Sequence, residues 1–179
     1  AVQHSGDMTA HAEPLDGYVV TTLAGEARRL GVGIAAGQPT LEDGKRYNSI
    51  VLLGRRGEVA AVYHKAFPTI WELERGIVPG PGAVVAETEF GRLGFAICYD
   101  LNFRELRAAY ADRRPDLVLF CSAFRGGLQT RWWGFETRSY VVSSCLDPRS
   151  VVVNPLGRVV AQTDSWTRTL TRTLNLDYA

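Results

Sequence analysis

Residues 93–98 read Leu-Gly-Phe-Ala-Ile-Cys, followed by Tyr-Asp-Leu-Asn at 99–102 and by helical periodicity at 103–113. The first segment is typical of an apolar strand, and the last is typical of a helix that ends before Pro115. A side chain at such a strand-to-helix corner is exposed above the sheet, near backbone N–H groups that can stabilise an oxyanion. Cys98 is therefore a candidate nucleophile, and a small buried core thiol is the alternative.

The rest of the chain alternates between the two kinds of periodicity. Helices are expected at 16–30, 103–113 and 128–138. Strands are expected at 32–37, 48–53, 59–64, 83–87, 92–98, 116–121, 139–144, 150–153, 159–162 and 169–174. Residues 1–15 show no period and are expected to form a loop or tail, and 66–82 is a long loop of the kind that is usually functional. This pattern predicts a layered α/β protein with one domain over residues 1–179.

The composition excludes several classes of protein. The chain has 179 residues, a net charge of +1, 46% hydrophobic and 22% charged residues, which are values of a globular protein rather than a disordered or fibrous one. The near-zero charge argues against nucleic-acid and anionic-membrane partners, and no apolar run approaches the ~18 residues of a bilayer span. The N-terminus lacks a signal-peptide pattern, and three widely separated cysteines suit a reducing compartment, so a cytoplasmic location is predicted.

No cofactor is predicted, because the chain contains neither a glycine-rich nucleotide motif nor a His/Cys/carboxylate cluster with the spacing of metal ligands. Cys121 lies inside an apolar strand and Cys145 follows one, so both fit a core role better than Cys98 does.

Charged groups that could activate Cys98 lie at the start of the long loop. Lys65 follows the strand at 59–64, where a fixed cation would lower a thiol pKa; a solvated lysine is the alternative. His64 suggests a Cys–His pair, but neighbours on a strand point to opposite faces, so His64 and Lys65 cannot both face one site. Glu72 and Glu74 could orient Lys65 or a substrate, or lie solvated in the loop.

Three segments, taken together, resemble the nitrilase superfamily of carbon–nitrogen hydrolases, from about Glu13 to the end of the chain. Tyr-Asn-Ser at 47–49, Gly-Glu-Val at 57–59 and Tyr-His-Lys at 63–65 resemble that family's catalytic-lysine segment. Residues 91–100, Gly-Arg-Leu-Gly-Phe-Ala-Ile-Cys-Tyr-Asp, with Asn-Phe-Arg-Glu-Leu at 102–106, resemble its nucleophile segment. Residues 150–159 resemble its late strand–turn–strand.

The resemblance implies an α-β-β-α sandwich of the carbon–nitrogen hydrolase type, incomplete at both ends, with a Glu–Lys–Cys triad. Cys98 would be the nucleophile, Lys65 would stabilise the tetrahedral intermediate, and the backbone N–H of Tyr99 would be the second oxyanion donor. Glu74 is preferred to Glu72 as a further loop glutamate that contributes. The implied substrate is a small linear amide or N-carbamoyl compound, because Cys98-Tyr99-Asp100 resembles the amidase and N-carbamoyl amidohydrolase branches.

The sequence also departs from the family pattern. The family's general-base glutamate lies in a Pro-Glu motif, which residues 1–15 lack. Glu13 precedes a proline and resembles a later loop of the family, so the role of general base is not assigned to it. The C-terminal tail is also absent, and the segment Trp133–Thr137 keeps only Glu136 of the usual pattern. These departures predict a fragment that is nearly inactive alone, from a parent that forms homodimers or higher homo-oligomers. Two alternatives stay open: an inactive binding or assembly module, and a Cys–His hydrolase that uses His64.

Overall fold

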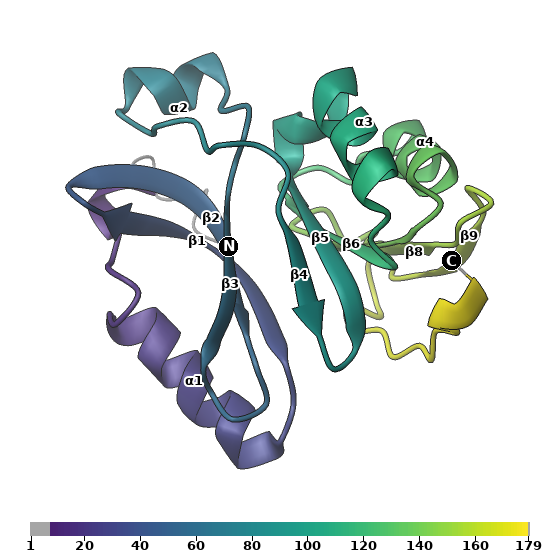
Figure 1. Cartoon of the computed structure of the whole chain (residues 1–179), viewed down its shortest axis with the longest axis horizontal. Coiled ribbons are helices and arrows are strands. Elements are labelled where there is room, and N and C mark those ends of the chain that lie inside the picture. Colours follow the sequence, from purple (N-terminus) through teal and green to yellow (C-terminus); the bar gives the residue numbers. More distant parts are fainter. Residues whose placement is uncertain (1–7, 179) are drawn as a thin grey trace. The chain divides into compact units, whose positions relative to one another are not determined.

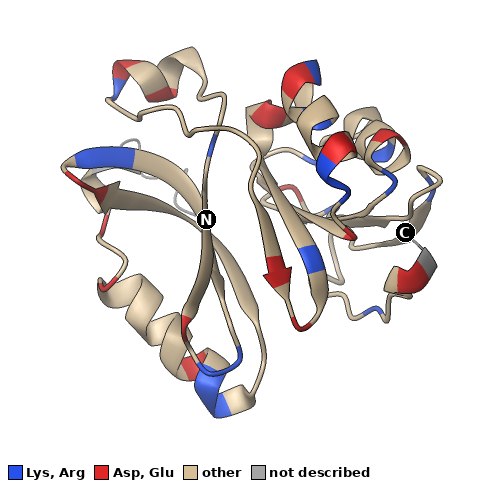
Figure 2. Ribbon diagram, viewed as in Figure 1, with Lys and Arg blue, Asp and Glu red and all other residues tan. Residues whose placement is uncertain are grey.

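The computed structural model describes residues 8–178, which form two compact units that meet between Gly82 and Ala83 (Figure 1). Part of the expected loop or tail at 1–15 lies outside the described residues, and Met8–His11 forms a short 3-10 helix, η2. None of the helices within 8–178 has the length and apolar character of a membrane-spanning segment. Acidic and basic residues are interspersed in each unit, as expected from the balanced composition (Figure 2).

The first unit is a three-stranded antiparallel sheet, β1-β2-β3, with one long helix. The strands are β1 (Ile34–Glu42), β2 (Lys45–Leu53) and β3 (Val59–His64), and the helix is α1 (Tyr18–Leu30). The β1–β2 hairpin reverses at Asp43 and Gly44, whose φ angles of 49° and 73° are those that a tight Asp-Gly turn requires. Val20 and Ala27 of α1 pack against Val51 and Leu53 of β2, so one helix face buries one sheet face.

The long loop between β3 and the second unit contains an unexpected helix, α2 (Ile70–Glu74). Thr69 and Glu72 form a capping box, in which each residue accepts a hydrogen bond from the other's backbone N–H. This local interaction explains why five residues without apolar periodicity form a helix. The expectation of an entirely irregular loop at 66–82 was therefore wrong at this point.

The second unit has a six-stranded sheet with the order β4-β5-β6-β7-β8-β9. Its strands are β4 (Val85–Thr88), β5 (Gly91–Ile97), β6 (Leu117–Ser122), β7 (Tyr140–Cys145), β8 (Val151–Val153) and β9 (Val159–Gln162). The central strands β5, β6 and β7 are parallel, and the other pairs are antiparallel. The sheet is therefore mixed, and the carboxyl ends of the parallel strands lie at one edge.

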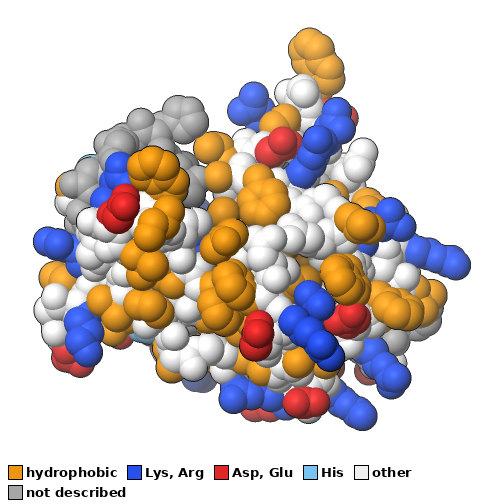
Figure 3. Space-filling model, turned by 90° about the horizontal axis from the view of Figure 1, so that it is seen from above, with side chains coloured by type: hydrophobic (Ala, Val, Ile, Leu, Met, Phe, Trp, Pro, Cys, Tyr) orange, Lys and Arg blue, Asp and Glu red, His pale blue; other side chains and the backbone are white. Residues whose placement is uncertain are grey.

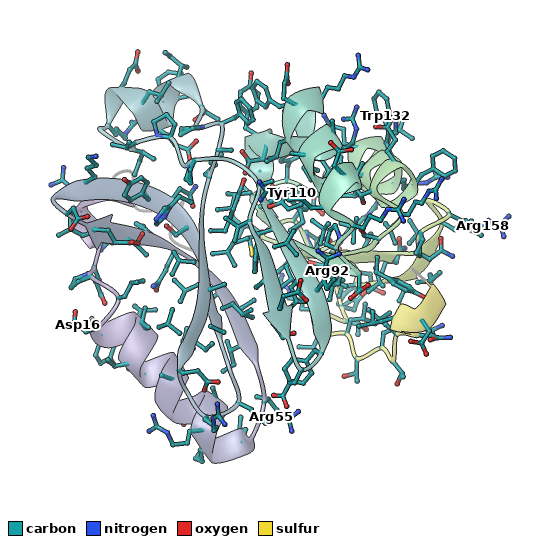
Figure 4. All side chains as sticks on the ribbon, viewed as in Figure 1. Asp16, Arg55, Arg92, Tyr110, Trp132 and Arg158 are labelled. Carbon is teal, nitrogen blue, oxygen red and sulfur yellow. The ribbon has the colours of Figure 1, made fainter. Side chains whose placement is uncertain are left out.

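Helices α3 (Arg104–Arg113) and α4 (Leu128–Thr137) connect these parallel strands and pack against each other. Tyr110 of α3 is fully buried, and its hydroxyl donates a 2.7 Å hydrogen bond to the carbonyl of Phe95 on β5 (Figure 4). Trp133 of α4 is equally buried, and its indole N–H donates to the carbonyl of Leu101. The core of this unit thus fixes both ends of the segment that contains Cys98.

One expected strand is absent. Residues 169–174 alternate apolar or basic residues with threonine, yet they form no ladder with any described strand and precede only a short 3-10 helix, η4 (Leu176–Tyr178). A strand requires a hydrogen-bonded neighbour as well as a suitable pattern. The prediction of a strand at 169–174 was wrong for this reason.

Candidate functional site

Lys65 is a buried lysine whose backbone is held on both sides. It follows β3 directly, its N–H donates to the carbonyl of Asn48 at 2.8 Å, and its carbonyl accepts from the N–H of Gly80 at 2.8 Å. A Cβ at position 80 would lie 2.2 Å from the carbonyl oxygen of His64, so only glycine permits this close approach. Lys65 is 1% exposed, which rules out the solvated lysine considered above.

Glu72 is the carboxylate that pairs with Lys65. The Lys65 ammonium donates to Oε2 of Glu72 at 2.6 Å, and Asn48 Nδ2 donates to Oε1 at 2.7 Å. Thr69 adds its backbone N–H at 2.6 Å and its hydroxyl at 2.9 Å. Burial would raise the pKa of Glu72, but the Lys65 charge and the hydrogen bonds from Lys65, Asn48 and Thr69 outweigh it and hold that pKa below its ordinary value. Glu72 is therefore a carboxylate at neutral pH.

Glu74 lies on the exposed side of α2, two residues further along the chain. Glu72, rather than Glu74, is the loop glutamate that contacts Lys65, and a contribution of Glu74 stays a prediction. The physical reason is the capping box, which turns position 72 inward at the first turn of α2. Asn48 and Thr69 also belong to this cluster, although the sequence had assigned no role to either.

His64 belongs to a different network from its neighbour Lys65. Its Nδ1 lies 2.9 Å from the hydroxyl of Ser49, its ring stacks on Tyr47 with centroids 3.9 Å apart, and Nε2 lies 3.4 Å from Glu42. Burial lowers the pKa of His64, and the nearby Glu42 carboxylate opposes this shift only in part. Because Asn48 and Ser49 alternate on β2, the two networks lie on opposite faces of the sheet.

Cys98 lies at the carboxyl end of β5, where the chain turns into the 3-10 helix η3 (Cys98–Asn102). Its φ angle is 49°, a left-handed backbone conformation that costs a non-glycine residue about 1–3 kcal/mol. The fully buried Asp100 braces the turn by accepting a 2.8 Å hydrogen bond from the N–H of Ile97. Tyr99 is 42% exposed and makes an edge-to-face contact with Phe103.

The other two cysteines lie on the neighbouring parallel strands, Cys121 on β6 and Cys145 on β7. Cys121 pairs in register with Ile97, and Cys145 pairs with Ser122, so all three cysteines gather at the carboxyl edge of the parallel strands. Burial raises the pKa of Cys121 to about 11 and also raises the pKa of Cys145. All three are free thiols, and no group of three or more His, Cys, Asp or Glu side chains within 8–178 is arranged to hold a metal ion.

Glu136, the residue retained from the family pattern in α4, joins the two helices of the second unit. Its carboxylate accepts a hydrogen bond from Arg107 of α3 at 2.5 Å and another from the Trp132 indole N–H. The Arg107 guanidinium also lies 4.3 Å from the ring centroid of Trp132, a residue of α4 that is labelled in Figure 4. The hydrogen bond from Arg107 lowers the pKa of Glu136, consistent with a structural ion pair.

The carbon-nitrogen hydrolase family matches residues 3–179 of the sequence, which is nearly the whole chain. The chain belongs to this family. Human deaminated glutathione amidase is 30% identical over 183 aligned residues, which cover 84% of this chain and 56% of the relative. The chain thus spans about half the length of that curated relative.

Solved structures agree with the family assignment. Nit3 of Saccharomyces cerevisiae, a nitrilase-superfamily member, matches with a TM-score of 0.74 at 22% identity over 89% of this chain and 70% of its own, which shows the shared fold. A variant of the amidase from Nesterenkonia sp. AN1 matches with a TM-score of 0.70 at 28% identity, over 80% of this chain and 61% of its own. That structure shows covalent addition of the acetamide moiety of fluoroacetamide at the active-site cysteine. The mixed α/β architecture expected from the sequence is therefore confirmed.

Proposed function

We propose that this carbon-nitrogen hydrolase chain carries the thiol nucleophile Cys98 and the cation Lys65 of an amidase that acts on small linear amides or N-carbamoyl compounds. The observation that carries the proposal is the backbone of Cys98. A non-glycine residue persists in a left-handed conformation only where its surroundings enforce it, and such strain is concentrated at functional sites. The buried Asp100 and the buried Trp133 enforce the turn on either side of the thiol.

The chemistry follows from covalent thiol catalysis. The Cys98 sulfur attacks the amide carbon, the carbonyl electrons move to oxygen, and a tetrahedral intermediate forms. The C–N bond then breaks, the nitrogen leaves as ammonia or an amine with the proton that the Cys98 thiol has lost, and a thioester remains on Cys98. Water attacks the thioester, its hydroxyl stays with the acyl group, and its remaining proton returns to the thiolate. One amide and one water thus give one acid and one molecule of ammonia or amine.

In this proposal, Lys65 stabilises the oxyanion of each tetrahedral intermediate, together with the backbone N–H of Tyr99. Glu72, rather than Glu74, keeps the ammonium in one orientation, because its carboxylate lies 2.6 Å from the Lys65 nitrogen. Lys65 belongs to the first unit and Cys98 to the second, so the approach of the two side chains stays a prediction. The role of general base is assigned to none of the described residues in this proposal.

The proposal is tested by the rate at which each thiol reacts with fluoroacetamide, measured by peptide mass spectrometry at pH 7.5. The thiolate displaces fluoride, so a C–S bond forms as the C–F bond breaks. We expect Cys98 to react at least tenfold faster than Cys121 and Cys145, whose raised pKa values leave little thiolate. Equal rates at the three thiols would overturn the proposal in favour of an inactive binding or assembly module.

Matched variants refine this experiment. Lys65→Met should slow the Cys98 reaction, whereas Lys45→Met, at an exposed strand end, should leave it unchanged. His64→Gln should also have no effect, since an effect would support the Cys–His alternative. Ammonia release from a small amide tests separately whether the isolated chain turns over, and the lack of a Pro-Glu motif in residues 1–15 predicts that it does not. Homodimer formation and a cytoplasmic location likewise stay predictions, and light scattering of the purified protein tests the first.

A further inference from the structure

The second unit contains a cavity of about 270 Å³ where the C-terminal segment crosses the sheet. One wall comes from β7 and β8, and the other from residues 163–174. The even-numbered residues Arg168, Leu170, Arg172 and Leu174 line the cavity, whereas the threonines between them do not. The alternating pattern that resembled a strand therefore reflects one side of an extended segment facing this cavity.

Two positive side chains that are exposed to solvent line this cavity, and neither has an acidic partner among the described residues. Arg168 and Arg172 both line it, and neither makes an ion pair or hydrogen bond with another residue of the described part of the chain. No acidic side chain is among the lining residues. Asp164, the acid nearest to Arg168 along the chain, instead accepts hydrogen bonds from the backbone N–H groups of Trp166 and Thr167. Asp177, the acid nearest to Arg172 along the chain, is not among the lining residues. Two guanidinium groups are thus available to an anion that enters from solvent.

The lining also includes apolar side chains and one hydroxyl that bonds no described residue. Val142, Val151 and Val152 line the cavity from the sheet, and Leu170 and Leu174 line it from the segment; these five residues are called the apolar base. Ser143, Ser150 and Thr163 also line the cavity, but their hydroxyls are engaged with the backbone. Ser144 has a hydroxyl that bonds no described residue. An occupant therefore needs a charged oxyanion end and a short apolar body.

We propose that this cavity is a binding site for a small aliphatic carboxylate. Guanidinium groups bind carboxylate oxygens in a bidentate geometry, and the apolar base accommodates a short alkyl chain. The volume lies below the ~300–1,000 Å³ of sites for drug-sized ligands, which favours a ligand of a few carbon atoms. The site does not involve Cys98 or Lys65, so the proposal is independent of the proposed amidase chemistry.

The test is isothermal titration of the full chain with butyrate, butyramide, acetate and inorganic phosphate. We expect butyrate to bind and its uncharged isostere butyramide not to bind. Butyrate should bind more tightly than acetate because its alkyl chain contacts the apolar base. Equal affinity for butyramide would overturn the role of the arginines. Equal affinity for phosphate or acetate would overturn the apolar part of the proposal and leave a general anion site.

Variants locate the binding. Arg168→Gln and Arg172→Gln should each weaken butyrate binding about tenfold or more, the loss expected for one charge-assisted pair. Arg158→Gln is the matched control, because Arg158 is exposed and projects away from the molecule (Figure 4). Titration of the Cys98→Ala variant tests for binding at the thiol. Its affinity for butyrate should equal that of the wild-type chain. Unchanged affinity in both arginine variants, with thermal unfolding also unchanged, would overturn the proposed site.

Discussion

Glu72→Gln removes one charge from the buried pair with Lys65 and changes little else. Glutamine has the shape of glutamate, and its amide oxygen can still accept hydrogen bonds from Lys65 and Thr69. The Asn48 amide can rotate to offer its oxygen to the new amide group. The substitution therefore isolates the contribution of the carboxylate charge from that of packing.

The magnitude follows from the distance and the burial. At 2.6 Å and an effective dielectric constant of about 20, the attraction between the two charges is roughly 6 kcal/mol. The desolvation of both ions offsets much of this attraction while the pair is intact. In the variant, the Lys65 side chain stays buried, with 1% exposure, but without a counter-charge. Breaking such a pair costs about 3–5 kcal/mol, and the retained hydrogen bonds favour the lower end of that range.

The assay is urea unfolding at pH 7, with hydrogen exchange of the peptides that cover 48–77 to locate the effect. Glu74→Gln is the matched control, because Glu74 lies on the exposed side of the same helix and should change stability by less than about 0.5 kcal/mol. Faster exchange is expected around the Lys65 N–H, which bonds the Asn48 carbonyl, and not in the second unit. If the two variants had the same stability, the reasoning about the buried pair would be refuted.

The Lys65–Glu72 pair also predicts how the free energy of unfolding changes in acid. The pKa of Glu72 is lowered from 4.5 in the folded state, so its ionisation stabilises the fold fully above pH 4.5, and this stabilisation is lost as the pH falls through the lower folded value. The difference in unfolding free energy between the wild type and Glu72→Gln should thus be constant from pH 7 to 5 and shrink below pH 4.5. A difference that already shrank between pH 7 and 5 would contradict the direction of this shift.

Further predictions concern single substitutions in the two units. The lowered pKa of His64 means that protonation disfavours the fold, so stability should fall as the pH drops below 6.5, and His64→Gln should remove this step from the acid titration. Tyr110→Phe should cost about 1–3 kcal/mol in urea unfolding, because the carbonyl of Phe95 loses a buried donor. Gly80→Ala should cost about 1–3 kcal/mol by steric overlap. Gly25→Ala in α1, where a Cβ meets nothing within 4 Å, should instead stabilise by about 0.5–1 kcal/mol.

Local patterns in the sequence predict most of the elements, because these elements depend on contacts near in sequence. The strand at 59–64 and the strand at 159–162 have the predicted bounds, and α3 and α4 differ from prediction by one residue. The segment 169–174 fails the same test because strand formation depends on a distant partner. Its threonines do alternate with apolar or basic residues, but an extended segment that lines a cavity with every second residue has the same period of two as a strand.

Exposed apolar residues show a similar limit. Ile70, Trp71 and Leu73 of α2 are all exposed, and apolar side chains reach the surface in several places (Figure 3). Hydrophobicity therefore does not identify the inward face of α2, where the buried residue is the charged Glu72. Hydrogen bonding determines this face instead, since the capping box needs the carboxylate at the third helical position. The Thr-x-x-Glu pattern at 69–72 is the signal in the sequence that favours Glu72 over Glu74.

The two neighbours Asn48 and Ser49 show how one strand supports two separate sets of polar groups. Asn48 contacts Glu72 and, through its carbonyl, Lys65, whereas Ser49 contacts His64 and Thr40 on the opposite face. Because successive side chains of a strand alternate, a substitution at one position leaves the other network in place. Lys65, the cation of the proposed oxyanion site, therefore faces away from its sequence neighbour His64. This separation explains in physical terms why a lysine and a carboxylate, rather than a Cys–His pair, fit the chemistry proposed for Cys98.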